Sequence, residues 1–265
     1  MAATTGDVKN FDYAIVGGGC LGASTALALI REWPDARIIW FEGDDAHTAS
    51  RDINKIIRAP YPDKDYVAFA TKAMELWRSV DLYREFFHRV GWIQVVPQDN
   101  HSYMIEGPND RMISTKEMQQ MVGSQSEPKL DQGEKLRLNE NIGYVDFKSA
   151  VEAVAKQASL LGVRREQRNI TKLLTDNGVS RGVEAGDESF MAKKTIVAAG
   201  AWTPGILERS RVEFPSDFFT VAGVGVAVLH LDEKESDELK SMPILIADTG
   251  MFKQNNMISH LLRYN

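Results

Sequence analysis

The stretch Phe11–Gly22, FDYAIVGGGCLG, decides how the first part of the chain folds. Its apolar run over Asp12–Val16 predicts a short buried strand, and four glycines follow within six residues. Small and apolar residues from Leu21 to about Trp33 predict a tightly packed helix, and Arg37–Phe41, RIIWF, predicts a second strand. Strand, glycine turn, helix and strand in this order form a βαβ unit, whose two strands run parallel.

The glycine turn and the end of the second strand together predict a dinucleotide site. Gly17, Gly19 and Gly22 have the spacing G-x-G-x-x-G. The first glycine permits a tight turn, the second lets the backbone approach a pyrophosphate, and the third lets helix and strand pack closely. The helix N-terminus offers free N–H groups to the phosphates. Glu42 lies 20 residues after Gly22, where a carboxylate accepts hydrogen bonds from ribose hydroxyls. The alternative is a glycine-rich turn that binds nothing.

Composition excludes several classes of protein. The chain has 265 residues, enough for one large domain or two modest ones. A net charge of −6 and a pI near 5.5 argue against a general nucleic-acid binder. Cys20 is the single cysteine, so no intramolecular disulfide forms, and the five histidines lack the spacing of metal ligands. Met1–Asn10 is polar and no apolar run reaches about 18 residues, so we expect a cytoplasmic protein without a membrane span.

Further elements follow along the chain. We expect helices at Asp65–Val80 and Phe147–Leu161, and strands at Trp92–Val96, Ile170–Leu174, Val179–Ala185, Lys194–Ala199 and Thr220–Leu231. Residues 1–60 and 143–205 have the character of a dinucleotide-binding domain. Residues 61–142 and 206–250 are expected to form a second, sheet-containing domain, followed by a divergent tail over 251–265.

Four motifs carry a resemblance to a known family. With GGGCLG at 17–22, FEGDD at 41–45, SRDINKIIR at 50–58 and AAGAWT at 198–203, the chain resembles the D-amino-acid-oxidase-like superfamily of FAD oxidoreductases. It is most similar to the sarcosine oxidase and fructosyl amino acid oxidase (amadoriase) branch. The resemblance implies an α/β fold: a Rossmann-like FAD-binding domain (GR2 type) interleaved with an α+β substrate domain, truncated at the C-terminus relative to the longer family members.

The resemblance implies FAD as the cofactor and a set of site residues. It implies that Lys55 and Lys240 lie near the flavin, Lys240 assisting the reaction with oxygen, and that Arg58 holds a substrate carboxylate. The implied cofactor-binding residues are Gly17, Gly18, Gly19, Cys20, Leu21, Gly22, Glu42, Ser50, Lys55, Ile56, Ile170, Gly200 and Trp202. Structural alternatives stay open, with both lysines as solvated charges and Trp202 as core. Arg51 is a second candidate for the carboxylate.

The activity implied by the resemblance is oxidation of a C–N bond. The substrate would be a secondary amine or N-substituted amino acid of the sarcosine or fructosyl amino acid type. Oxygen would be the acceptor and hydrogen peroxide a product, in a setting such as a fungal biosynthetic pathway. A second hypothesis is a non-catalytic FAD-binding remnant or partner-dependent fragment, because the family's covalent-flavin cysteine is implied to lie in the missing part. A third is an FAD-linked dehydrogenase. The substrate and the oligomeric state stay open.

Overall fold

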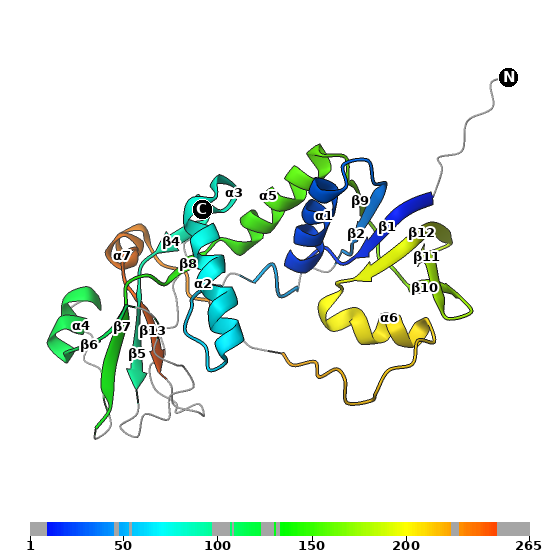
Figure 1. Ribbon diagram of the computed structural model, residues 1–265. Helices are drawn as coiled ribbons and strands as arrows, with labels where there is room; N and C mark the ends of the chain where they lie inside the picture. Colours follow the sequence, from blue (N-terminus) through cyan, green and yellow to red (C-terminus); the bar gives the residue numbers. More distant parts are fainter. Residues whose placement is uncertain are drawn as a thin grey trace. The chain divides into compact units, whose positions relative to one another are not determined.

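A computed structural model describes residues 10–44, 48–52, 55–96, 107, 109–122, 130, 133–223 and 228–247. The chain divides into two compact units, each made of two separate segments. Unit 1 comprises Met1–Asp52 and Phe147–Val224, and unit 2 comprises Ile53–Asp146 and Gly225–Asn265. Each unit has its own β-sheet structure (Figure 1).

Unit 1 is built on a six-stranded sheet with the order β10-β11-β12-β1-β2-β9. Its strands are β1 (Asn10–Val16), β2 (Ile38–Glu42), β9 (Arg164–Gln167), β10 (Lys172–Asp176), β11 (Val179–Ala185) and β12 (Glu188–Val197). Strands β12, β1, β2 and β9 pair in parallel, whereas β10 and β11 are antiparallel. The parallel pairing of β1 and β2 across one helix is the predicted βαβ unit, and the α/β fold is confirmed.

Helices α1 (Cys20–Glu32) and α5 (Phe147–Leu160) pack against each other beside β2 and β9 (Figure 1). Helix α1 buries residues on one face that are small or aliphatic: Gly22, Ala23, Ala26, Leu27 and Ile30. A second apolar cluster contains Ile39, Phe41 and Phe190, and the Phe41 and Phe190 rings meet edge to face with centroids 5.0 Å apart. Alternation along β2 therefore gives the strand two buried faces.

The turns of unit 1 follow the chemistry of their residues. Asn177 and Gly178 have φ values of 49° and 76° between β10 and β11, as the TDNG turn requires. Gly162, with φ of 110°, follows the end of α5. The 3₁₀ helix η1 (Gly200–Trp202) leads directly into α6 (Thr203–Arg209).

One predicted strand is wrong, and one strand of unit 1 was missed. Residues 220–223 and 228–231 form no strand, and residues 224–227 lie outside the described part of the chain. Val221 and Val228 are more than half exposed, so their β-branched side chains lack the packing surface on which β-propensity depends. The strand of unit 1 that was not predicted is β9, whose sequence RREQ has no apolar alternation.

Unit 2 contains two further sheets. The four-stranded sheet has the order β13-β5-β7-β6, and the three-stranded sheet has the order β3-β8-β4. The strands are β3 (Ile56–Ile57), β4 (Phe87–Arg89), β5 (Trp92–Val96), β6 (Asp110–Ile113), β7 (Lys135–Asn139), β8 (Gly143–Val145) and β13 (Ile244–Ala247). The helices are α2 (Lys64–Ser79), α3 (Asp81–Arg84), α4 (Thr115–Val122) and α7 (Glu233–Leu239).

Strand β7 separates an apolar layer from a polar one inside unit 2. Leu136 and Leu138 belong to the apolar cluster that includes Met118 of α4. On the alternate positions of the strand, Arg137 is 3% exposed, and its Nη2 donates to Gln94 Oε1 at 2.7 Å. Arg137 also pairs with Asp110, at 3.6 Å between Nε and Oδ2. A buried charge is costly unless it is paired and hydrogen-bonded, and Asp110 and Gln94 serve Arg137 in these two ways.

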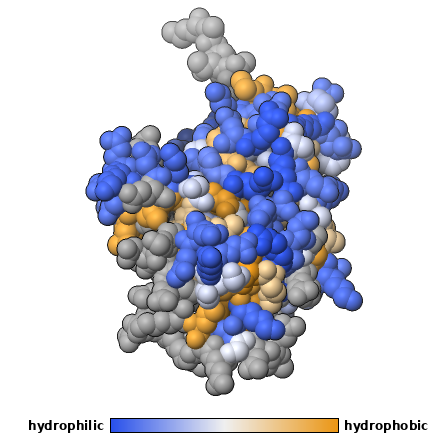
Figure 2. Space-filling model, turned by 90° about the vertical axis from the view of Figure 1, so that its left-hand side faces the viewer, coloured by the Kyte–Doolittle hydropathy of each residue, from blue (hydrophilic) through white to orange (hydrophobic). Residues whose placement is uncertain are grey.

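The described surface is mostly hydrophilic in the view of Figure 2, with hydrophobic side chains in smaller groups between polar ones. Tyr66 and Phe69 on α2 are among the exposed large hydrophobic residues, at 63% and 72%. In the described ranges, no helix combines the length and apolar character needed to cross a bilayer.

Candidate cofactor-binding site

Three neighbouring parallel strands of unit 1 end at the same edge of the sheet. Val16 at the end of β1 pairs in register with Phe41 of β2, and Glu42 is the last residue of β2. The Gly17 N–H donates to the Phe41 carbonyl at 2.9 Å, and the Ala198 N–H after β12 donates to the Val16 carbonyl at 2.7 Å. Ligands of open α/β sheets bind at the carboxyl ends of such strands, so this edge is the candidate site.

The glycine turn is held by close backbone contacts. Gly17 has φ of 121°, and a Cβ at this position would lie 2.2 Å from the Ala198 carbonyl oxygen. A Cβ at Gly22 would lie 1.9 Å from the Gly17 carbonyl oxygen. Gly19 differs, because the nearest atom to its Cβ position is the Ser50 hydroxyl oxygen at 3.0 Å. Gly17 and Gly22 are therefore needed by the fold itself, whereas Gly19 leaves room next to the start of α1.

The amino end of α1 offers positive charge at this edge. Its N-cap residue is Gly19, which supplies no side-chain cap, and the first turn Cys20–Gly22 contains no acidic residue. The Cys20 N–H donates to Ser50 Oγ at 2.9 Å, which brings these two predicted site residues together. This helix start has no carboxylate, and the Ser50 hydroxyl and the Gly19 backbone lie next to it. Such a site fits an anionic pyrophosphate.

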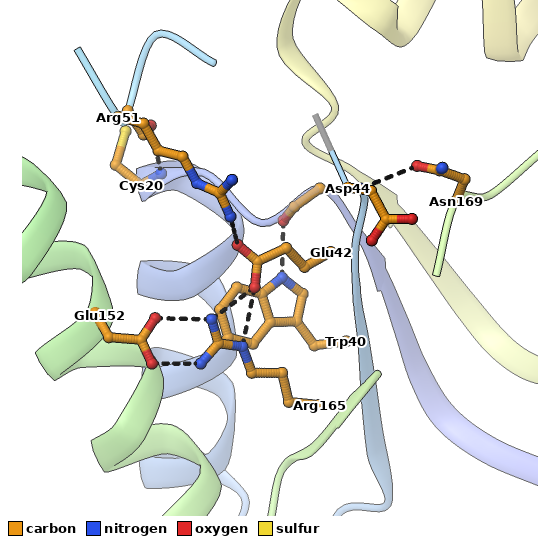
Figure 3. Close-up of polar contacts among 10 residues, drawn as sticks. Cys20, Trp40, Glu42, Asp44, Arg51, Glu152, Arg165 and Asn169 are labelled. Atoms are coloured by element: carbon orange, nitrogen blue, oxygen red, sulfur yellow. Dashed lines mark hydrogen bonds and ion pairs between the residues drawn. The ribbon is translucent and has the colours of Figure 1, made fainter. Parts of the chain in front are cut away.

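Glu42 lies between two arginines (Figure 3). Glu42 is 8% exposed as a whole residue. Arg51 Nη2 donates to Glu42 Oε1 at 3.0 Å, and Arg165 donates to Glu42 Oε2 from Nη2 at 2.6 Å and from Nε at 3.1 Å. An ionised carboxylate has about four acceptor positions, so these three bonds leave capacity for a ligand hydroxyl. A carboxylate with an acceptor position left fits a hydroxyl donor such as the ribose of an adenine dinucleotide.

The other predicted site residues of unit 1 lie in different surroundings. Ile170 is buried in the apolar cluster with Phe41, in the connection between β9 and β10. Gly200, with φ of 53°, begins η1 and has open space at its Cβ position. Trp202 is 44% exposed and Leu21 is 70% exposed. Their roles toward a cofactor stay predictions.

The remaining predicted residues belong to unit 2. The Lys55 carbonyl accepts from the Val145 N–H at 3.1 Å, and Ile56 lies on β3 with a half-buried side chain. Lys240 follows α7, where its side chain is 71% exposed and pairs with Asp237 at 3.5 Å. The proposed role of these lysines near a flavin stays a prediction.

Arg58 contacts aromatic rings in unit 2. Its guanidinium carbon lies 4.5 Å from the centroid of the Tyr61 ring and 5.6 Å from that of the Trp92 ring. Such stacking limits the rotation of the guanidinium. Arg51, the other candidate for a substrate carboxylate, instead contacts Glu42 in unit 1.

Three residues at the glycine-turn edge were missed from sequence. Trp40 is fully buried, and its indole Nε1 donates to the Gly17 carbonyl at 2.7 Å. Arg165 and Glu152 belong to β9 and α5. The sequence signal for β9 was Gly162, which ends the helix before it. After that helix, a βαβ unit requires another parallel strand. Among the described residues, no cluster of three histidine, cysteine or acidic side chains could hold a metal ion.

The sequence matches one family model and several known proteins. Residues 12–253 match the family model described as FAD dependent oxidoreductase, DAO. L-saccharopine oxidase of Schizosaccharomyces pombe is 24% identical over 269 residues, covering 87% of this chain and 59% of that protein. A monomeric sarcosine oxidase of an Arthrobacter species is 21% identical over 263 residues, covering 92% and 65%.

Solved structures show the same fold. The fructosamine oxidase of Aspergillus fumigatus, Amadoriase II, superposes with a TM-score of 0.69 at 19% identity, covering 91% of this chain and 59% of that one. The chain thus spans about 60% of the length of the relatives it matches. The resemblance inferred from the motifs is confirmed: the chain belongs to the family of FAD-dependent oxidoreductases.

Proposed function

We propose that unit 1 holds the adenosine diphosphate end of FAD, and that the whole protein oxidises the C–N bond of a secondary amine or N-substituted amino acid. The observation that supports this most directly is the edge where the Gly17–Gly22 turn and Glu42 meet. The turn offers N–H groups, and Glu42 offers a carboxylate. Family membership supplies the cofactor class, and both relatives named above are oxidases of such amino acids by their names.

The residues of unit 1 bind and orient the cofactor in this proposal. The start of α1 and the Ser50 hydroxyl contact the pyrophosphate, and Glu42 accepts hydrogen bonds from the ribose. Once bound, FAD supplies the chemistry of hydride acceptance that amino-acid side chains lack. The protein fixes the adenine half, so that the reactive half is held in one orientation.

The residues of unit 2 are proposed to serve the substrate and oxygen. Arg58 binds a substrate carboxylate through two parallel N–H donors, as guanidinium groups do. Lys55 and Lys240 supply positive charge, which stabilises the anion that develops when oxygen is reduced towards hydrogen peroxide. The substrate class is the one shared by the names of the relatives: saccharopine and sarcosine are both N-substituted amino acids.

A spectrum of the purified protein tests the proposal. Residues 1–265 are expressed, free flavin is removed and the visible absorption is recorded. A flavin band that bleaches under anaerobic conditions with saccharopine, sarcosine or a fructosyl amino acid supports the oxidase. A band that persists with all three supports cofactor binding without this activity. A colourless protein that does not take up added FAD contradicts the proposed cofactor site. Gly19→Val is the matched variant, because its side chain occupies the space beside the start of α1 and should abolish flavin retention.

A further inference from the structure

Arg165 lies where it can control the carboxylate at the ribose end of the site. It is on β9, which pairs in parallel with β2, and its Cα partner in that pairing is Trp40. Side chains alternate along a strand, so Trp40 and Glu42 emerge on one face of β2 and Arg165 emerges beside them on β9. Glu42 is thus the diagonal neighbour of Arg165, within reach of a long side chain.

Arg165 is held from two directions besides Glu42. On the side of α5, its Nη1 and Nη2 donate to the two carboxylate oxygens of Glu152 at 2.7 and 2.8 Å, a two-pronged pair (Figure 3). Its guanidinium carbon lies 5.1 Å from the Trp40 ring centroid. Trp40 is itself fixed by its bond to the Gly17 carbonyl. Arg165 therefore connects α5, β2 and the glycine turn.

The charges of this cluster balance. Glu42 and Glu152 contribute two negative charges, and Arg51 and Arg165 two positive ones. The hydrogen bonds with Glu152, and then those with Glu42, raise the pKa of Arg165 above its ordinary value. Arg165 consequently keeps its charge, so the largely buried carboxylate of Glu42 lies beside a compensating positive charge.

The two carboxylate oxygens of Glu42 differ in the acceptor positions that their hydrogen bonds leave. Glu42 Oε2 accepts two N–H groups from Arg165, which matches the two lone pairs of one carboxylate oxygen. Glu42 Oε1 accepts from Arg51 at 3.0 Å, so one of its lone pairs is left for another donor. The carbon stem is confined too, because a Cβ on Gly18 would lie 2.3 Å from Glu42 Cγ.

We infer that Arg165 is the positioning residue of the ribose site: held by Glu152 and Trp40, it fixes Glu42 so that Oε1 accepts a ribose hydroxyl. This inference rests on the proposed function, since it assumes that the edge binds an adenine nucleotide. Without Arg165, the Glu42 carboxylate rotates and the hydrogen bond to the ribose loses its alignment. The effect is confined to the ribose, because the pyrophosphate binds to the start of α1.

Two nucleotides that differ only in the ribose separate this role from a structural one. The dissociation constants of ADP and 2′,3′-dideoxy-ADP are measured by calorimetry with the full chain, freed of flavin. A hydrogen bond to a carboxylate contributes about 1.5–3 kcal/mol, so the wild type should prefer ADP by about tenfold or more. Arg165→Met keeps the aliphatic stem and removes the charge. The preference of this variant for ADP over 2′,3′-dideoxy-ADP should fall to about threefold or less.

Three further variants sharpen the outcome. Arg165→Lys keeps the charge but loses the two-pronged contact, so its preference should be intermediate and it replaces Arg165→Met if that variant does not fold. Glu152→Gln should also be intermediate. Arg164→Met is the matched control, because Arg164 is the adjacent residue on β9 and pairs with Glu166 at 2.8 Å. The preference of Arg164→Met for ADP over 2′,3′-dideoxy-ADP should equal that of the wild type.

The failures of the inference and of the proposed function give different results. Suppose that the wild type prefers ADP, and that Arg165→Met or Arg165→Lys weakens the binding of both nucleotides equally or of neither. The inference is then overturned and the cofactor site stands. If the wild type binds both nucleotides equally, or binds neither, Glu42 is not a ribose ligand. In that case the proposed adenosine site and the inference fail together.

Discussion

Both units of the chain hold a carboxylate against an arginine, and the surroundings of the two pairs differ. In unit 1, Glu42 ends β2 and Arg165 lies on the parallel neighbour β9, with side chains 11% and 28% exposed. In unit 2, Asp110 and Arg137 lie on the antiparallel neighbours β6 and β7, with side chains 5% and 3% exposed. The first pair is accessible to a ligand, whereas the second is enclosed by protein.

A carboxylate–arginine pair therefore serves different purposes according to what covers it. An enclosed pair contributes nothing to ligand binding, yet removal of one partner leaves an uncompensated charge. A pair at a strand end is still reached by water, so its removal costs less stability and changes what the site binds. Stability and ligand binding should therefore respond separately to changes at the two pairs.

The largest effect is expected from Arg137→Met in unit 2. This change leaves Asp110 buried without its arginine, and breaking a buried pair costs about 3–5 kcal/mol. Urea unfolding should show the lower free energy of unfolding in unit 2, while the affinity of unit 1 for ADP stays unchanged. Arg111→Met is the control, because Arg111 pairs with Glu117 at the surface, where it is 45% exposed. A fall in ADP affinity with Arg137→Met would contradict the proposed independence of the two pairs.

A smaller loss of stability is expected from Gly22→Ala in unit 1. The added methyl group would meet the Gly17 carbonyl at 1.9 Å, and overpacking of this kind costs about 1–3 kcal/mol. Gly19→Ala is the matched variant, because its methyl group meets only the Ser50 hydroxyl at 3.0 Å. Gly19→Ala should keep the thermal stability of the wild type within about 0.5 kcal/mol and weaken ADP binding. Equal destabilisation by both changes would contradict the distinction between the two glycines.

The sequence predicted the first βαβ unit well, because its signals are local. The strand at Asp12–Val16 and the helix from Leu21 agree with β1 and α1 to within a few residues. Strand β9 was missed, since an edge strand of charged residues has no apolar alternation. The approach of Arg165 to Glu42 joins positions 123 residues apart, which no local pattern reveals.

The polar layer of unit 2 was missed for another reason. Sequence reasoning places arginine and glutamine on the surface, because isolated charges are costly to bury. Gln94 is nevertheless 0% exposed and Arg137 is 3% exposed. Each is a partner for the other, and only the pairing of β5 with β7 brings them together. The chemistry of a buried polar pair depends on both members, so it cannot be predicted from either position alone.

A change of ligand preference is expected from Glu42→Ser, with a free-energy effect of about 1.4 kcal/mol. The change removes the carboxylate and leaves Arg51 and Arg165 facing the ribose position. Two guanidinium groups bind a phosphate well. The ratio of the affinities for adenosine 2′,5′-bisphosphate and ADP should therefore rise by about tenfold. Calorimetry with both nucleotides measures the ratio, and Glu166→Ser on β9 serves as control. An unchanged ratio would show that the two arginines do not face the ribose.

The smallest effect is expected from the acid sensitivity of Glu152. The hydrogen bond from Arg165 lowers the pKa of the Glu152 carboxyl below its ordinary value. A lowered pKa in the folded state contributes stability that is fully present above the ordinary carboxyl pKa of about 4, and that is lost as the pH falls through the lower value. Glu152→Gln should therefore cost stability at pH 6 and cost less at pH 3. Since the Glu152 side chain is 61% exposed, the difference should stay under about 0.5 kcal/mol.

Asp12 provides the control for Glu152 at the other end of the sheet. The hydrogen bond from Lys193, which lies 2.7 Å away, lowers the pKa of the Asp12 carboxyl, so Asp12→Asn should show the same direction of pH dependence. Asp12 is near the amino end of β1, whereas the ribose site is at the carboxyl end. At pH 6, therefore, Glu152→Gln should lower the preference for ADP over 2′,3′-dideoxy-ADP, and Asp12→Asn should leave it unchanged. A loss of preference in both variants would mean that the ribose site responds to the stability of unit 1 as a whole and not to the contact between Glu152 and Arg165.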